Sequence, residues 1–143
     1  MQLQTSRFGT IEINPNEGIF KIKDGLAGFS GYENYTIVLD PNYPEGLFVW
    51  LQSADKPDLA FAVTEPRIWF REYSVMNYNG DLSDIGLRNA NDQHLDLLTI
   101  VNKYGNTLTT NLGEPIVVNR ATRQARQIIL PGHPIRQELL IAA

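Results

Sequence analysis

Short apolar runs and clusters of turn-forming residues alternate along the whole chain, which is typical of antiparallel β structure. Residues 2–5 and 9–13 alternate between polar and apolar side chains, and residues 35–39 are rich in β-branched residues. Residues 47–52 and 59–64 are apolar at consecutive positions, as expected for strands that are covered on both faces or curled into a barrel. We predict further strands at residues 19–22, 95–101, 108–112, 115–119 and 126–130.

Helical signals are few. Residues 81–85 are the best candidate, because Asn79 or Asp81 could cap the start and Gly86 suits the position after the last turn. Residues 64–67 predict one further turn, with Pro66 at its first position. The sequence therefore predicts a mainly β fold: a small antiparallel β-barrel-like single domain over residues 1–143, with one or two short helices.

Composition and charge narrow the class of protein. The chain is 43% hydrophobic and 20% charged, as in ordinary globular proteins, and it has no cysteine, which excludes disulfides and thiolate metal sites. Residues 1–66 carry four Lys and Arg against nine Asp and Glu, whereas residues 67–143 carry eight against seven. The acidic half favours a basic protein partner over a phosphate backbone, and an unevenly charged but merely solvated surface is the alternative interpretation.

No segment resembles an export signal or a membrane span, which would need about 20 apolar residues. We therefore expect a cytoplasmic protein with no membrane partner.

Motifs that would support catalysis are missing. His94 and His133 are far apart, and no phosphate-binding glycine loop is present. Residues 28–32 lack the second glycine of a nucleophile elbow, and two aspartates in one turn, Asp55 and Asp58, are a poor acid–base pair. The sequence predicts a protein that is not an enzyme and that carries no catalytic residue, metal or cofactor.

A small β-barrel could instead bind RNA by stacking bases on exposed aromatic side chains. Arg120, Arg123 and Arg126 surround the last predicted turn, and Tyr104 lies in the preceding hairpin loop. Because three arginines on a turn are more often simply solvated, and the chain is acidic overall, an RNA-binding module is the second hypothesis and no direct nucleic-acid partner is expected.

Three blocks of sequence resemble the flagellar assembly factor FliW family. They are Trp-Leu-Gln-Ser at residues 50–53 followed by Pro-Asp-Leu-Ala-Phe and Thr-Glu-Pro within residues 57–66, Gly-Leu-Ala-Gly-Phe at residues 25–29, and residues 110–119 with Gln127 downstream. The chain departs from the family pattern at Glu114, where a small residue is usual, and at Ala125, where glycine is common.

This resemblance implies a compact β-barrel-like protein without enzymatic activity. Members of the family bind flagellin in the cytoplasm before export, and they bind the translational repressor CsrA and relieve its block on flagellin synthesis. Flagellin and CsrA are therefore the expected partners, in a partner switch, and the free protein is expected to be a monomer.

We predict partner contacts at residues from three segments. Asp55 and Asp58 could face a basic partner, and Trp69, Phe70 and Tyr73 are expected to be exposed near Pro66. The residues Asn111, Pro115 and Asn119 come from the family block, although turn geometry is the alternative explanation for them. The predicted partner-binding residues are Asp55, Asp58, Trp69, Phe70, Asn111, Pro115 and Asn119.

Overall fold

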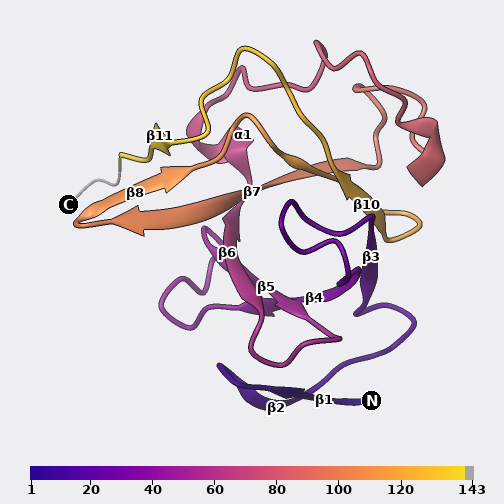
Figure 1. Ribbon diagram of the computed structural model, residues 1–143, viewed down its shortest axis with the longest axis vertical. Coiled ribbons are helices and arrows are strands. Elements are labelled where there is room, and N and C mark those ends of the chain that lie inside the picture. Colours follow the sequence, from indigo (N-terminus) through magenta and orange to yellow (C-terminus); the bar gives the residue numbers. More distant parts are fainter. Residues whose placement is uncertain (141–143) are drawn as a thin grey trace.

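Seven strands close into a barrel in the computed structural model, which describes residues 1–140 (Figure 1). Neighbouring strands are antiparallel except β10 and β3, which run parallel and close the ring. The mainly β, barrel-like prediction is confirmed. In order around the barrel, the strands are β3 (Phe20–Lys23), β4 (Asn34–Leu39), β5 (Val49–Ser53), β6 (Ala60–Thr64), β7 (Leu95–Tyr104), β9 (Ile116–Asn119) and β10 (Gln124–Gln127).

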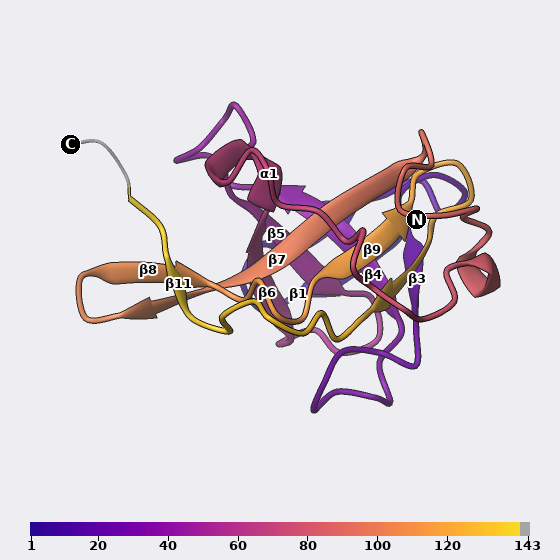
Figure 2. The ribbon, with the colours of Figure 1, turned by 90° about the horizontal axis from the view of Figure 1, so that it is seen from above.

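Two further strand pairs lie outside the ring. β1 (Gln2–Thr5) and β2 (Gly9–Glu12) form a separate hairpin below β4 and β5 in Figure 1. The second half of β7 leaves the barrel and pairs with β8 (Thr107–Thr110), so that this hairpin projects to the side (Figure 2). The short β11 (Gln137–Glu138) covers the other edge of β8.

In the part of the chain that the structure describes, helix is confined to two single turns. α1 (Pro66–Trp69) begins at Pro66 as predicted, and the Glu65 side chain caps it by accepting from Arg67 N. The helix expected at residues 81–85 is the shorter 3₁₀ turn η1 (Ser83–Ile85), whose N-cap residue Leu82 offers no side-chain acceptor. Gly86 ends this turn at φ +80°, in the left-handed conformation that its lack of a Cβ permits.

Apolar side chains are buried on both sides of the barrel wall around β7 and β9. The interior is filled by side chains that point inward from successive strands. On the outside, Leu95, Leu97 and Val117 are covered by the chain between α1 and β7, which contributes Tyr73 and Leu87. This double burial explains why the barrel strands read as nearly continuous apolar runs. The inward-facing side chains that are fully buried are Ile22, Tyr35, Leu51, Val63, Ile116 and Ala125.

One end of the barrel is sealed by its own chain. The loop between β3 and β4, residues 24–33, lies inside the outline of the strands in Figure 1. Leu26 is buried in the interior cluster, and Phe29 packs edge to face on Phe61 with ring centroids 5.2 Å apart. Gln127 anchors this plug, because its Oε1 accepts from Ala27 N at 2.8 Å while its Nε2 donates to Glu114 O at 3.0 Å. We call this the closed end.

Candidate functional site

The opposite end of the barrel is open and forms a cavity of about 730 Å³, which we call the mouth. It lies where β4, β6 and β9 end and where β3, β5 and β7 begin. A volume of this size is within the range of ordinary ligand sites. The apolar side chains that line the mouth are those of Phe20, Ile37, Val49, Leu98 and Val118.

Strand β4 carries apolar side chains out of the barrel interior into solvent. Ile37 pairs with the buried Leu51, and Leu39 pairs with Val49, so both belong to the inward-facing side of β4. At the mouth no segment of residues 1–140 covers them: Ile37 is 40% exposed and Leu39 is 62% exposed. An apolar surface at the rim of a cavity is the kind of feature that marks a binding site for a protein segment.

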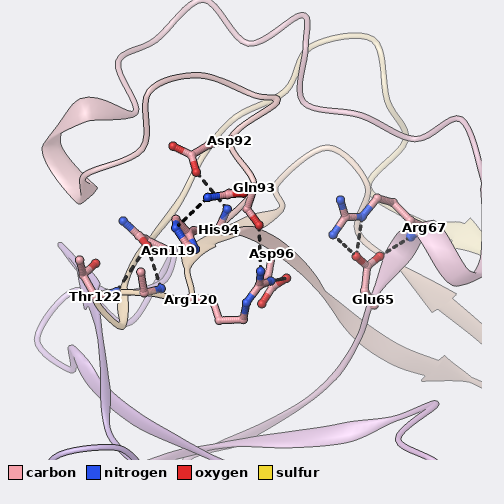
Figure 3. A network of polar contacts seen from close by, with 10 residues as sticks. Glu65, Arg67, Asp92, Gln93, His94, Asp96, Asn119, Arg120 and Thr122 are labelled. Atoms are coloured by element: carbon pink, nitrogen blue, oxygen red, sulfur yellow. Dashed lines mark hydrogen bonds and ion pairs between the residues drawn. The ribbon is translucent and has the colours of Figure 1, made fainter.

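Charged pairs surround the apolar floor (Figure 3). Glu65 accepts from the side chain of Arg67, and Asp96 accepts from Arg120 Nη1 at 2.7 Å. Arg123, which also lines the mouth, makes no side-chain hydrogen bond or ion pair with any residue in the described range 1–140. The rim therefore offers both signs of charge, with one guanidinium left available.

The loop beside the rim is fixed by hydrogen bonds to the backbone. The Asp92 carboxylate accepts from Arg88 N at 3.0 Å and from His94 N at 2.9 Å, and these bonds lower the pKa of Asp92 below its ordinary value. His94 O then accepts from Arg120 N at 2.8 Å, and Gln93 O accepts from Arg120 Nη2 at 2.8 Å. The two carbonyl oxygens thus hold the backbone and the guanidinium of Arg120 in position for its ion pair with Asp96.

Asn119 is the one predicted site residue at the edge of the mouth, and it is buried there. Its Nδ2 donates to Ile85 O at 2.8 Å, and its Oδ1 accepts from Ala121 N at 3.0 Å. These bonds tie β9 to η1 and shape the turn into β10. This geometry matches the turn explanation more closely than a direct contact with a partner.

The acidic turn between β5 and β6 lies at the closed end, far along the strands from the mouth. Both Asp55 and Asp58 are exposed. The Asp55 carboxylate accepts from Asn34 N at 3.3 Å, and Asp58 forms an ion pair with Lys56 at 3.3 Å. The turn is available to a partner, but the structure does not bring it together with the residues of the mouth.

The aromatic group near Pro66 is less exposed than we expected. Tyr73 is only 6% exposed and its hydroxyl donates to Leu112 O at 2.6 Å, so its expected exposure is wrong. Trp69 is half-buried against Phe48 and donates to Thr64 Oγ1, and Phe70 is half-buried between two clusters. The chain between α1 and β7 needs these rings to cover the outside of the barrel.

Asn111 and Pro115 share the turn between β8 and β9. The Oδ1 of Asn111 accepts from Gly113 N and Glu114 N, and its Nδ2 donates to Glu114 Oε2 at 2.9 Å. Pro115 is buried beside them. The departure from the family pattern at Glu114 thus adds a side-chain bond within the turn.

Sequence reasoning missed Ile37, Glu17 and Asp96, which line the mouth, and the exposed Leu39, which follows Ile37 on the same side of β4. Ile37 and Leu39 lie in a run that reads as an ordinary core strand, and only the closure of the barrel leaves its end uncovered. One feature of the sequence does indicate an exposed strand end: Leu39 directly precedes the loop residues Asp40 and Pro41.

The arginines behind the RNA hypothesis are largely neutralised. Arg120 is paired with Asp96, and Arg126 is paired with Asp84 at 2.6 Å, which leaves Arg123 alone. A single unpaired arginine is a weak electrostatic footprint for a nucleic acid.

The fold and the site together define a small seven-stranded β-barrel protein with one plugged end and one open, apolar-floored end. Comparison with known proteins identifies its family: residues 2–139 match the family model described as FliW protein. The chain belongs to the FliW family.

Relatives and a solved structure agree with this assignment. "Flagellar assembly factor FliW" of Thermoanaerobacter pseudethanolicus is 30% identical over 97% of this chain and 95% of its own length. The protein of the same name in Magnetococcus marinus is 33% identical over 98% of this chain and 85% of its own length. A solved structure titled "Crystal structure of the flagellar assembly factor FliW" superposes with a TM-score of 0.81 at 26% identity, covering 99% of this chain and 98% of that one.

Two kinds of feature are absent from the described residues. Within residues 1–140, no helix has the length and apolar character needed to cross a membrane. In the same residues, no three His, Cys, Asp or Glu side chains are grouped as metal ligands would be.

Proposed function

We propose that this protein acts in the cytoplasm as a flagellar assembly factor that binds flagellin and the translational repressor CsrA, and that it works by binding and not by catalysis. The observation that carries the proposal is the open mouth of a barrel from the FliW family, with an apolar floor and a charged rim. A monomer with this surface can receive a protein segment, because the mouth needs no second copy to complete it.

Flagellin is the proposed occupant of the mouth. A flagellin that has not yet assembled carries amphipathic terminal segments, whose apolar side can pack in a hydrophobic groove. Leu39 and Ile37 would contact the apolar side of such a segment, and Arg123 would face its acidic groups. Assembly and export would then compete with the mouth for the same apolar surface of flagellin.

CsrA is proposed to meet the acidic first half of the chain. CsrA binds RNA and is therefore expected to present a basic surface, and complementary charge accelerates encounter and selects partners. Asp55 and Asp58 are exposed on the turn at the closed end and suit this contact. Among the other predicted contact residues, Trp69 ends α1 and Phe70 follows it, and both are half-buried. Asn111, Pro115 and Asn119 would act by fixing the turns around them.

Calorimetric titration with monomeric flagellin and with CsrA, each from the host bacterium, tests the proposal. We expect micromolar or tighter binding to each partner. The double variant Asp55→Lys, Asp58→Lys should weaken CsrA binding and leave flagellin binding unchanged, whereas the control Glu72→Lys, at another exposed acid, should change neither. If a folded protein binds neither partner, the proposal is wrong.

The RNA-binding alternative makes the opposite prediction. It requires direct affinity for RNA that falls steeply as salt is added, and Arg123 would carry the effect. A gel-shift assay at low salt that shows no complex excludes it.

A further inference from the structure

The barrel wall is incompletely paired between β6 and β7. These strands pair only at Val63 with Ile100 and at Thr64 with Thr99. Beyond this point β7 bends away with β8, as Figures 1 and 2 show, while β6 continues along β5. Residues 60–62 of β6 and residues 101–104 of β7 therefore each have one edge without a strand partner in the described chain. We call the opening between them the β6–β7 notch.

The notch is a groove with an apolar lining and a volume of about 310 Å³. Ala60 and Ala62 form one wall. Val101 and Leu108 form the opposite wall, and Trp50 stands at one side. Unpaired backbone edges above an apolar groove are the combination that accepts an additional strand.

Cations without carboxylate partners gather around this notch. Of the twelve Lys and Arg residues, seven are ion-paired with a carboxylate of residues 1–140. Two of the remaining five lie at the notch. Lys103 lines it, and Arg7 stacks 4.3 Å above the ring of Trp50, which also lines it. In a chain of net charge −4, this concentration of free cations selects an acidic occupant.

We propose that the β6–β7 notch binds an extended, acidic peptide segment of a partner protein by strand addition. The segment would form backbone hydrogen bonds with the free edges of β6 and β7. On the outer face of the sheet, its side chains would lie over Ala60, Ala62 and Leu108, and the carboxylates on that face would reach Lys103 and Arg7. This site is separate from the mouth, so its test does not depend on whether flagellin binds there.

The test uses the whole protein and a synthetic acetyl-Val-Glu-Val-Glu-Val-Glu-amide peptide. Hydrogen–deuterium exchange should slow by about tenfold at amides within residues 60–62 and 101–104 when the peptide is bound, because strand addition protects edge amides. The same peptide methylated on its backbone nitrogens should not bind, and a peptide with Lys in place of Glu should bind more weakly.

Variants locate the effect. Lys103→Glu should weaken binding of the acidic peptide by roughly three- to tenfold, since a rim charge contributes a modest energy that reversal doubles. Arg71→Glu is the matched control, because Arg71 is also exposed and without an ion pair but does not line the notch. Protection elsewhere or nowhere, equal binding of the methylated peptide, or an unchanged affinity in Lys103→Glu would each overturn the proposal.

Discussion

The two ends of the barrel are built from the same strands, but one end is plugged and the other is open. At the closed end, residues 24–33 fold inward and cover the apolar side chains, with Phe29 on Phe61. At the mouth no segment of the described chain covers Ile37 and Leu39, which remain exposed on a side of β4 that is otherwise core. The chain can plug a barrel end with one of its own loops, yet it leaves the apolar side chains of the mouth uncovered. This contrast favours a binding role for the mouth.

Most of the sequence blocks that resemble the family build the closed end. Residues 25–29 are the plug itself, and Gln127 joins it to the turn that contains Glu114. Gln52, from the Trp-Leu-Gln-Ser block, donates its Nε2 to the carbonyl oxygens of Ser53, Pro57 and Leu59 at the β5–β6 turn. The sequence blocks that resemble the family therefore reflect how the barrel is built, and most residues of the mouth lie outside these blocks.

The largest expected effect is on the plug. Gly25 has φ +71°, and a Cβ there would lie 2.5 Å from Phe29 O and 2.9 Å from Ser30 Cα, which are backbone atoms that cannot move aside cheaply. Gly25→Ala should therefore lower the free energy of unfolding by about 3 kcal/mol or more, as measured by urea denaturation.

The control for the plug is Gly28→Ala. Gly28 has φ +84° but nothing within 4 Å of an added Cβ, so the variant carries the backbone strain without the collision. Its cost should be about 1 kcal/mol. Equal losses in the two variants would show that close packing of the plug does not stabilise the closed end.

A smaller loss is expected from Gln127→Ala. The variant removes both hydrogen bonds that link the plug to the β8–β9 turn, and it should lower the free energy of unfolding by about 1–2 kcal/mol. Gln124→Ala, on the same strand at an exposed position, is the control and should cost less than about 0.5 kcal/mol. If both variants unfold at the same urea concentration, Gln127 is not an anchor.

The sequence predicted most of the strands and did not predict the mouth, for a physical reason. Alternation and turn residues are local, so the β1–β2 hairpin and the turn of α1 at Pro66 could be anticipated. The partner of β10 could not, because its parallel pairing with β3 joins segments about a hundred residues apart. Whether Leu39 is core or surface depends on that closure, and so the mouth could not be read from the sequence.

The buried Tyr35 in the barrel interior should make the stability of the protein depend on pH in the alkaline range. Tyr35 is fully buried and its hydroxyl has no hydrogen-bond partner in residues 1–140, and burial, with a smaller effect of Asp55, raises its pKa to about 12. Since the unfolded pKa is about 10, the stability contributed by the neutral phenol is complete below pH 10 and is lost as the pH rises towards 12.

Tyr35→Phe removes this dependence. Relative to wild type, the variant should gain about 1 kcal/mol between pH 8 and pH 11, as measured by urea denaturation at each pH. At pH 8 its stability should equal or exceed that of wild type, because the lost hydroxyl was unpaired. Parallel pH profiles for the two proteins would mean that Tyr35 ionises as readily in the fold as in the unfolded chain.

The smallest effect on stability is expected at the mouth. Leu39 is 62% exposed, so Leu39→Ser should change the free energy of unfolding by less than about 0.5 kcal/mol. Ile129→Ser is the matched control, because Ile129 is 72% exposed at the closed end. Under the proposed function, Leu39→Ser should nevertheless weaken flagellin binding about tenfold, since an apolar anchor contributes more than 1 kcal/mol to an interface, while Ile129→Ser should not. Unchanged flagellin affinity in a folded Leu39→Ser protein would remove this side of β4 from the interface and leave the open end of the barrel without its proposed occupant.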